Sequence, residues 1–513
     1  MSLFADLTDH RVLPLEPYDT LASYLAVAGG AGLFDARAVS ADVVLDELEA
    51  SGLRGRGGAG FPTATKWRTV TAYASCVMRT CVVVNAAEGE PGTYKDRAIL
   101  RANPYAVIEG ALIAAHVVGS HSITIAVKRR FVVEIARLRA AVADVQRAGW
   151  SDGIVIEIAE GPSEYLFGEE TGLLEVIDGR PPFPRIAPPW RRGLVEVVLD
   201  RSDLGSGSGL AGEVQMATEA SGSIAPPALV NNVETMANVP AIIAKGAAWF
   251  RSVGTDDSPG TVICTVSGAG RSPSVIEVAF GEPLRPVLDH AIIVNDDVEV
   301  TGRRPILAVL MGVSNAILTA EHLDTPITHE DMKRAGSGLG SASFIVIEEG
   351  TDPLAVAAGV SRFLAVESCG QCTPCKQGGL AVFESLRAML VQGGTGRDRV
   401  AVDRLLGTLT DGARCNLATQ HQLVVRSILD TFDDEVRTHL QPGHRSGVPV
   451  LITELMSLDD APESVDGSFL SKRADWTFND DKSESRLASP VDDPGRSAVD
   501  RFGDHRSGHN ALL

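Results

Sequence analysis

Three cysteines occur within seven residues of the chain, and a fourth follows forty residues later. The segment ESCGQCTPCKQGG places Cys369, Cys372 and Cys375 in a Cys-x-x-Cys-x-x-Cys pattern, and Cys415 completes the set. Three thiolates on one tight loop can bind three corners of a cubane iron–sulfur cluster, while a distant thiolate binds the fourth. Zinc is the main alternative, although its ligands more often come as two separate pairs, and chance clustering of structural cysteines is the third. The pattern favours a [4Fe–4S] cluster.

The other cysteines, Cys76, Cys81 and Cys264, are scattered along the chain, which has seven in total. An odd and sparse count in a long chain does not indicate a disulfide framework. We interpret these three as small buried apolar residues.

A glycine-rich segment with basic residues is the second chemical signature. The residues Gly55 to Phe61 read GRGGAGF, and Lys66 follows. Glycines let the backbone turn sharply and approach a ligand, while Arg56 and Lys66 supply positive charge for a phosphate. No strand clearly precedes the segment, so it does not match the dinucleotide fingerprint G-x-G-x-x-G. A flexible surface loop is the alternative.

Three further polar segments could line a ligand site. They are Asn85–Gly92 (NAAEGEPG), Tyr165–Thr171 (YLFGEET) and Asn231–Thr235 (NNVET). Each has a simpler alternative: an acidic turn, a helix start with acidic residues at its positive end, and an N-cap formed by Asn232.

The elements around these segments alternate between strand and helix. Apolar runs predict strands at 81–86, 123–127 and 154–159, and helical spacing predicts helices at 41–50, at 96–118 with a break at Pro104, and at 132–148. This alternation predicts an α/β domain with a largely parallel sheet. Its ligand should lie at the carboxyl ends of the strands, where the segment from Asn85 begins.

The second half of the chain changes character several times. Residues 179–226 are rich in Pro, Gly and Ser and predict a long irregular loop, and a helix is expected at 233–250. Short β-like runs between 261 and 349 indicate a small α+β domain. Four helical segments from 353 onward predict a small bundle. Residues 441–513 are poor in apolar side chains and acidic, so we expect a disordered tail.

Composition excludes several classes of protein. The 513 residues carry a formal net charge of −20, which makes nucleic acid an improbable partner. The longest uncharged apolar stretch, residues 305–320, is shorter than the ~20 residues that a bilayer requires. The start, MSLFADLTDH, lacks the pattern of a secretory signal. We therefore expect a cytoplasmic protein without direct membrane insertion, or one peripheral to a membrane complex.

The five segments together, in this order, closely resemble the 51 kDa type of flavin-bearing, NADH-oxidising subunit of respiratory complex I. Diaphorase subunits of NAD-linked hydrogenases and formate dehydrogenases are similar. The resemblance covers about residues 15–440 and implies an α/β fold class with three parts: an FMN-binding α/β domain, a small ubiquitin-like (SLBB-type) α+β domain, and a C-terminal four-helix bundle with an iron–sulfur cluster. The expected boundaries are 1–50 for an N-terminal helical segment, 51–250, 251–350 and 351–440 for the three domains, and 441–513 for the tail.

The resemblance also implies roles for individual residues. Glu88 and Glu90 would be catalytic, beside the flavin and the nicotinamide. FMN and NAD(H) would be bound by Gly55, Arg56, Gly57, Gly58, Gly60, Phe61, Lys66, Asn85, Glu88, Glu90, Tyr165, Gly168, Glu169, Glu170, Asn231, Asn232 and Thr235. Phe61 would stack on the nicotinamide nucleotide, and the four clustered cysteines (Cys369, Cys372, Cys375 and Cys415) would hold the cluster.

The implied activity is that of an NADH dehydrogenase flavoprotein subunit. A hydride would pass from NADH to FMN, and single electrons would pass to the [4Fe–4S] cluster and on to a partner. Because the chain has no second cysteine set, that partner is expected to be an iron–sulfur or ferredoxin-like subunit. Carboxylates near the nicotinamide would favour NADH over NADPH by like-charge repulsion.

Five positions depart from the family pattern, all of them on the donor side. Ala87 and Gly89 stand where the family usually has Asp and Ser, Ala187 and Trp190 where it has Lys and Phe, and Thr69 where it has an aromatic residue. The hypothesis that follows is a divergent paralogue. One alternative is a flavo-iron–sulfur subunit of a formate dehydrogenase or hydrogenase-type complex with another donor or a ferredoxin-like acceptor. The other is a non-catalytic, partner-binding paralogue.

Overall fold

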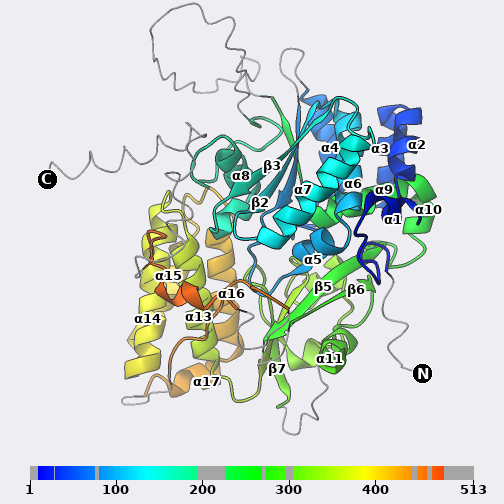
Figure 1. The fold of residues 1–513 in the computed structure, drawn as a ribbon. Coiled ribbons are helices and arrows are strands. Elements are labelled where there is room, and N and C mark those ends of the chain that lie inside the picture. The colour runs from blue at the N-terminus through cyan, green and yellow to red at the C-terminus, as the bar shows by residue number, and fades with distance from the viewer. Residues whose placement is uncertain are drawn as a thin grey trace, which may run out of the picture.

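The computed structural model describes residues 10–27, 29–74, 80–194, 226–268, 273–294, 304–441, 447–458 and 465–478. Two sheet-containing regions lie beside a helical bundle (Figure 1). Cys76, most of the predicted loop 179–226 and residues 479–513 lie outside the described residues.

The N-terminal region is built on a four-stranded parallel sheet. Its strands are β1 (Cys81–Ala86), β2 (Ser122–Lys128), β3 (Val155–Gly161) and β4 (Ala228–Asn232), in the order β3-β2-β1-β4. The run Val82–Val84 is completely buried, as expected of a parallel strand covered on both faces. The predicted strand 81–86 is confirmed, and all four strands end at the same edge of the sheet.

Helices enclose this sheet and extend beyond it. They are α1 (Leu21–Leu25), α2 (Ala31–Ala38), α3 (Ala41–Ser51), α4 (Thr63–Ala72), α5 (Lys95–Ala102), α6 (Pro104–Val118), α7 (Val132–Arg147), η1 (Tyr165–Gly168), α8 (Glu170–Ile177), α9 (Val233–Lys245) and α10 (Ala247–Phe250). The predicted break before α6 is confirmed: the side chain of Asn103 caps it by accepting from the N–H of Ala106, and Pro104 occupies its first turn.

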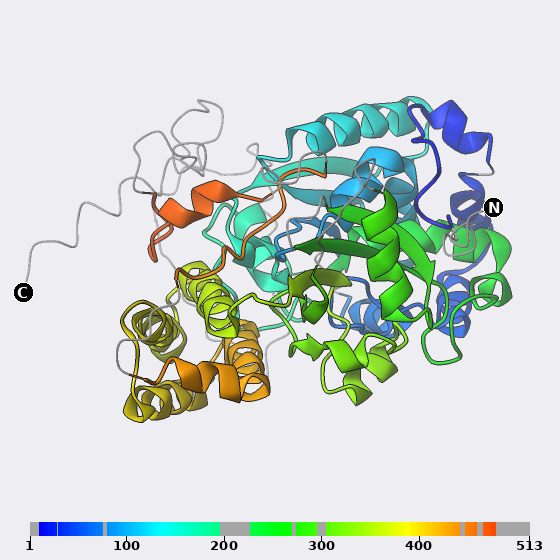
Figure 2. The same cartoon turned by 90° about the horizontal axis from the view of Figure 1, so that it is seen from below.

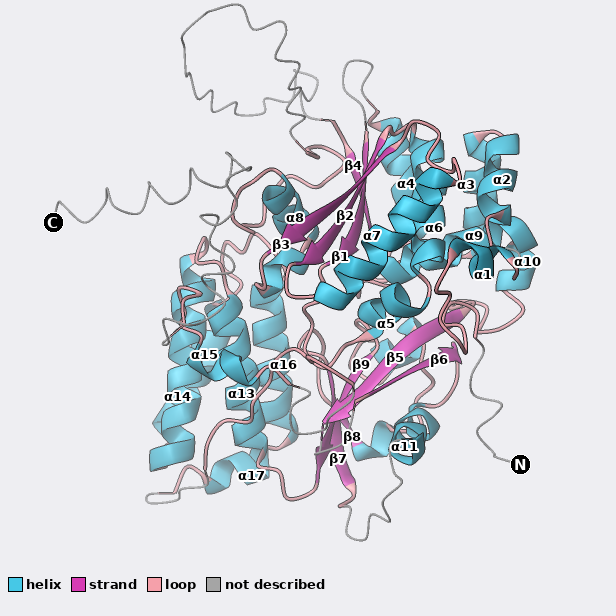
Figure 3. Cartoon of the chain, viewed as in Figure 1, coloured by secondary structure: helices cyan, strands magenta, loops and turns pink. Residues whose placement is uncertain are grey.

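A mixed five-stranded sheet forms the second region (Figure 3). Its order is β6-β5-β9-β7-β8, where β5 is Thr261–Gly268, β6 Ser274–Ala279, β7 Ile306–Met311, β8 Leu318–Thr319 and β9 Ser343–Glu348. Only β5 and β9 pair in parallel among these strands as described. The helical elements of this region are α11 (Leu284–Val294), η2 (Ala320–His322) and α12 (His329–Arg334). The alternation of strands and short helices agrees with the predicted α+β character.

The third region is helical. It consists of α13 (Pro353–Glu367), a π-helical turn, η3 (Pro374–Gly378), α14 (Gly379–Gln392), α15 (Gly396–Thr408), α16 (Leu417–Thr431) and the short α17 (Asp433–Thr438). Helix α13 is buried along almost its whole length, since α14 and α16 pack against it. The predicted bundle is present, with α17 as an additional short helix.

The prediction of a disordered tail from 441 is wrong for residues 447–458 and 465–478. These residues run along the junction between the bundle and the N-terminal region. Their one helical turn, η4 (Gly467–Ser471), appears there in orange-red (Figure 2). Ile452, Leu455 and Phe469 are buried there. The prediction failed because it used the average composition of residues 441–513, which does not show that a few apolar residues are buried or that acidic residues form the buried ion pairs described below. Within the described part of the chain, no helix combines the length and apolarity that crossing a bilayer requires.

Candidate functional site

Three of the predicted segments meet at the carboxyl edge of the parallel sheet. Strands β1 and β4 pair so that Asn85 lies opposite Asn232. The glycine-rich loop lies over this pair, because a Cβ added to Gly57 would be 3.3 Å from the Cβ of Asn232. The backbone N–H of Arg56 donates to Thr235 Oγ1 at 2.9 Å. A glycine loop, two amides and a helix start therefore share one edge, which is where this architecture places a ligand.

Asn232 is held by a buried polar cluster. Its Oδ1 accepts from the N–H of Glu234 at 3.0 Å and from Lys95 Nζ at 3.1 Å, and its Nδ2 donates to Asp96 at 2.6 Å. Lys95 also lies 2.9 Å from Glu234. Burial lowers the pKa of Lys95, but the neighbouring carboxylates outweigh that effect and raise it. The simpler alternative for this segment, an N-cap formed by Asn232, is confirmed, and the same side chain also belongs to the buried cluster.

The residues Lys95 and Asp96 were missed by the sequence reasoning. Both are buried, although a charged pair at a helix start normally predicts an exposed turn. Their position in the sequence could have indicated a role at the site, because Lys95 and Asp96 closely follow the acidic segment Asn85–Gly92 at the end of β1. Asn231 has a separate contact, since its Oδ1 accepts from Trp67 Nε1 at 2.9 Å.

The two basic residues of the glycine-rich segment are already paired within the protein. The Arg56 guanidinium is buried 4.5 Å from the ring centre of Phe280 and 3.8 Å from Glu234, and burial lowers its pKa to about 10. Lys66 pairs with Glu170 and donates to the carbonyl of Val230 at 3.1 Å. The loop can therefore offer a ligand its backbone N–H groups more readily than the Arg56 side chain.

The two carboxylates of the acidic segment have different surroundings. Glu88 accepts from Arg97 Nε at 2.8 Å and from the N–H of Asp96 at 2.9 Å, so its oxygens are occupied by protein donors. Glu90 accepts from Tyr165 Oη at 2.6 Å and from the N–H of Val313 at 2.8 Å. Burial raises the pKa of Glu90. Glu88 is therefore held by residues of the N-terminal region. Glu90 lies where the N-terminal region contacts the mixed-sheet region, because Val313 follows β7.

The segment from Tyr165 continues the wall of this site. Asn85 Nδ2 donates to the carbonyl of Gly168 at 2.8 Å. Glu169 caps α8 by accepting from the N–H groups of Thr171 and Gly172 at 3.0 and 2.8 Å, so the simpler alternative for this segment, a helix start, is confirmed. Phe61 is 49% exposed, which leaves its ring free for a stacking contact.

Together these features fit a flavin nucleotide in three respects. Backbone N–H groups lie on a glycine loop, amide side chains lie at two strand ends, and a helix begins at Asn232.

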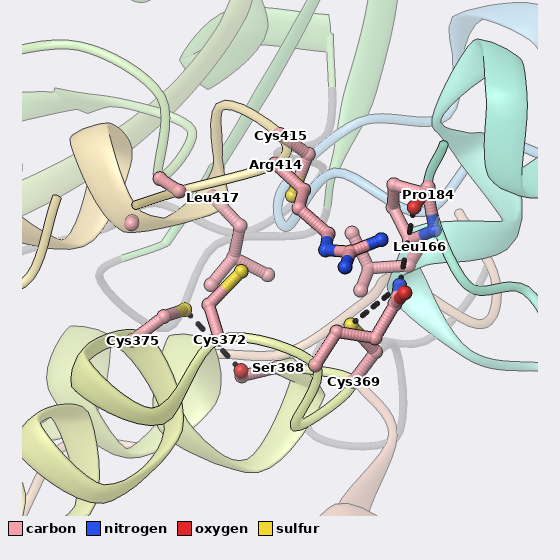
Figure 4. Close-up of a pocket in the computed structure, with 12 residues that line it drawn as sticks. Leu166, Pro184, Ser368, Cys369, Cys372, Cys375, Arg414, Cys415 and Leu417 are labelled. Carbon is pink, nitrogen blue, oxygen red and sulfur yellow. Dashed lines mark hydrogen bonds between the residues drawn. The ribbon is translucent and has the colours of Figure 1, made fainter. Parts of the chain in front are cut away.

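The four predicted cysteines line one cavity. Cys369, Cys372, Cys375 and Cys415 surround it together with Leu166, Pro184 and Leu417 (Figure 4). All four are free thiols. Two polar side chains reach the sulfurs: Ser368 Oγ lies 3.3 Å from Cys375 Sγ, and Gln371 Nε2 donates to Cys369 Sγ at 3.5 Å. Within the described residues, no three His, Cys, Asp or Glu side chains have the arrangement of a single-ion site.

This cavity fits an iron–sulfur cluster. Burial raises the pKa of Cys375, and that of Cys415 to about 12, so a thiolate at either position needs a cationic ligand to replace the proton. The ammonium group of Lys376 donates to the carbonyls of Ala365, Val366 and Ser368 at 3.0, 3.1 and 2.7 Å. Lys376 thereby ties the cysteine loop to the end of α13.

One short turn connects the two candidate sites. Within η1, Tyr165 bonds Glu90 at the strand-end site, while the next residue, Leu166, lines the cysteine cavity. No long segment separates the places where a flavin and a cluster would lie.

Comparison with known proteins agrees with both sites. Residues 48–241 match the family model described as the Nuo51 FMN-binding domain, and residues 355–439 match the NADH-ubiquinone oxidoreductase-F iron–sulfur binding region. The second F subunit of the NADH-quinone oxidoreductase of Rhizobium meliloti (strain 1021) is 30% identical over 83% of this chain and 94% of its own length. The F subunit of the NADH-quinone oxidoreductase of Mycobacterium tuberculosis (strain H37Rv) is 33% identical over 83% of this chain and 91% of its own.

A solved structure is similar as well. The crystal structure of an NAD⁺-reducing [NiFe]-hydrogenase in the air-oxidized state matches with a TM-score of 0.67 and 29% identity, over 85% of this chain and 69% of the hydrogenase chain. The cofactor regions, the fold and the relatives agree with one another. The chain belongs to the F-subunit family of NADH-quinone oxidoreductases, as a flavoprotein subunit of NADH dehydrogenase type with an FMN-binding domain and a [4Fe–4S]-binding region.

Proposed function

We propose that this chain takes electrons from NADH at the strand-end site and delivers them through the cysteine cavity to a partner subunit. The observation that carries the proposal is the turn η1, in which adjacent residues border both sites. When bound, FMN accepts a hydride from NADH and the [4Fe–4S] cluster accepts electrons singly, so the pair converts two-electron into one-electron transfer.

The residues of the chain bind and orient in this proposal. The loop Gly55–Phe61 and the amides of Asn85, Asn231 and Asn232 hold the flavin nucleotide. Glu90, fixed by Tyr165 and by the N–H of Val313, borders the place of the nicotinamide. Glu88 acts through its bond to Arg97 and is a positioning residue.

Electrons leave from the cysteine cavity. Gly370, Thr373 and Ala413 are exposed around it, so a partner could approach this edge of the bundle. We infer that the partner is an iron–sulfur or ferredoxin-like subunit. Similarity to the NAD⁺-reducing hydrogenase favours a second candidate, in which the same chain works within a hydrogenase-type complex.

The test is anaerobic purification, followed by cofactor identification and titration with NADH. We expect one FMN and one [4Fe–4S] cluster per chain, bleaching of the flavin absorption by NADH, and an electron paramagnetic resonance signal from the reduced cluster. A flavin and a cluster that NADH leaves oxidised would refute the proposal. Absence of flavin bands would favour a non-catalytic, partner-binding protein instead.

A further inference from the structure

Residues 447–458 and 465–478, here named the C-terminal strap, lie beyond the part of the chain that matches the iron–sulfur region, which ends at 439. The strap is attached to the bundle through α13. The N–H of Val450 donates to the carbonyl of Ala355 at 3.0 Å, and Trp476 Nε1 donates to the carbonyl of Val366 at 2.9 Å. Lys376 of the cysteine loop also donates to that carbonyl.

The strap supplies the counter-charge for two buried cations of the N-terminal region. Glu454 pairs with Lys128 at the carboxyl end of β2 and with Arg130, while Asp466 pairs with Arg130 at 2.7 Å. Lys128 is completely buried. Burial would raise the pKa of Glu454, but Arg130 and Lys128 outweigh it and keep that pKa low. The charges of Lys128 and Arg130 are therefore compensated by a segment that lies more than 300 residues later in the sequence.

Two cations that the strap contacts, Lys128 and Arg97, lie against the acidic turn of the strand-end site. A Cβ on Gly89 would lie 2.9 Å from Lys128 Nζ, so this ammonium touches the turn directly. The next strap residue, Leu455, accepts through its carbonyl from Arg97 at 2.8 Å, and Arg97 in turn holds Glu88. Two consecutive strap residues thus fix the two residues that precede Glu90.

The second half of the strap is connected to Glu90 through Glu367 and Tyr165. Lys472 Nζ pairs with Glu367 Oε1 at 2.6 Å, and Glu367 Oε2 accepts from the N–H of Tyr165 at 2.9 Å. Tyr165 then donates to Glu90. The contacts of both halves of the strap thus reach the turn Glu88–Glu90.

We propose that the C-terminal strap is an integral part of the NADH-oxidising site, and that Glu454 and Lys472 are positioning residues that fix the turn Glu88–Glu90 against the flavin. This proposal rests on the proposed function for the reaction, but the attachment of the strap does not depend on it. Removing one partner of a buried ion pair leaves the other charge uncompensated, so the turn should shift in a Glu454→Gln variant.

The experiment compares Glu454→Gln with Asp475→Asn in the full-length holoprotein. Asp475 is a matched control because it lies on the same strap, is exposed, and accepts only from Thr477 among its described hydrogen bonds. The readouts are the visible spectrum and midpoint potential of the bound flavin, the kinetic constants with NADH, and hydrogen exchange of residues 447–458.

In Glu454→Gln we expect a raised flavin midpoint potential, because an uncompensated cation near the turn favours the reduced flavin. We also expect kcat to fall by about ten- to a hundredfold with a smaller change in KM, since the shifted turn misaligns the nicotinamide and the flavin more than it weakens NADH binding. Glu454→Asp should restore part of kcat. Lys472→Met should lower kcat in the same way through Tyr165, and Asp475→Asn should match the wild type in every readout.

Wild-type flavin spectrum, potential and kcat in Glu454→Gln would overturn the proposal, and faster hydrogen exchange of the strap alone would identify it as a structural clamp. A Glu454→Gln protein that fails to fold leaves Glu454→Asp and Lys472→Met to decide by the same readouts. If the wild type binds flavin but does not react with NADH, the proposed function fails, while the flavin spectrum and potential still decide the role of Glu454.

Discussion

At the scale of single residues, the carboxylate of Glu90 distinguishes this site from a simple flavin-binding edge. Glu90 is half-buried and accepts from Tyr165 and Val313, whereas Glu88 is buried and accepts from Arg97 and the N–H of Asp96. The two glutamates looked equivalent in the sequence because both follow a strand. Their contacts give them different roles: Glu88 is held by Arg97, whereas Glu90 accepts from Tyr165. A substitution of Tyr165 therefore tests the role of Glu90.

Replacing Tyr165 by Phe should slow flavin reduction by NADH by about tenfold. The variant leaves the half-buried carboxylate of Glu90 with one donor fewer, which costs about 1–3 kcal/mol. Stopped-flow bleaching of the flavin measures the effect. Tyr105→Phe is the control, since Tyr105 Oη on α6 donates in the same way to Asp144 of α7 at 2.7 Å. Equal rates in both variants would show that the bond to Glu90 has no part in the reaction.

The preference between the two nicotinamide dinucleotides also belongs to this scale. Glu169 and Glu170 lie at the wall of the strand-end site, and partial burial of Glu169 raises its pKa. Carboxylates near the ribose would repel the additional phosphate of NADPH. We expect kcat/KM for NADH to exceed that for NADPH by about tenfold or more. Steady-state flavin reduction with each dinucleotide measures the ratio, and equal efficiency would contradict the expectation.

At the scale of elements, the cysteine cavity depends on helices that the sequence places far apart. Three cysteines lie between α13 and α14, and Cys415 precedes α16. Cys415→Ser should therefore lose the absorption and paramagnetic signals of the cluster while the flavin remains bound. Cys264→Ser is the control, because Cys264 is buried within β5, away from the cavity. A cluster that survives in Cys415→Ser would remove this residue from the ligand set.

A second prediction at this scale concerns the N-terminal segment. Glu277 on β6 accepts from the N–H groups of Val12 and Leu13 and from Thr261, and burial raises its pKa to about 7. The folded protein therefore holds this proton more tightly than the unfolded chain. The stabilisation is complete below about pH 4.5 and is lost as the pH rises toward 7, by up to about 3 kcal/mol. Melting temperatures between pH 5 and 8 should vary less in Glu277→Gln than in the wild type; identical profiles would contradict this.

Elements were more predictable than the contacts between them. The strand 81–86 was clear because an apolar run ends at polar residues, and Pro104 marked the boundary between α5 and α6. The short strand β4 was missed, since its five residues directly precede a helix and end in two asparagines. Three of the four cavity cysteines were recognised by their spacing within one loop, and Cys415 was added as the cysteine that follows them in the sequence.

The orientation of Arg56 could not be foreseen, because a sequence does not show that Phe280 and Glu234 compete for its guanidinium. The same reason hid Lys95 and Lys128: a lysine is buried only when distant residues compensate its charge. Residue types at the site were therefore predictable, while their pairing depended on the tertiary structure.

At the scale of the whole molecule, the strap joins the flavin and cluster regions by close packing as well as by charge. A Cβ on Gly359 of α13 would lie 2.1 Å from the carbonyl oxygen of Val450, so this helix accepts the strap only with a glycine there. Gly359→Ala should lower stability by about 1–3 kcal/mol and loosen the strap.

The control for this prediction is Gly407→Ala in α15. Nothing lies within 4 Å of a Cβ at Gly407, so the helix should gain up to about 1 kcal/mol. Thermal unfolding and hydrogen exchange of residues 447–458 measure both variants. Stabilisation by both substitutions would contradict the tight packing of the strap on α13.

The distance in sequence between Lys128 and Glu454 also affects how the protein is made. The two residues are 326 positions apart. A ribosome that adds about 5–20 residues per second needs roughly 15–65 s to pass from one to the other. For that time the ammonium of Lys128 and the guanidinium of Arg130 lack the carboxylate of Glu454. The contacts of the strap with the acidic turn can thus form only after residue 454 has been made, when the cysteine loop has already been synthesised.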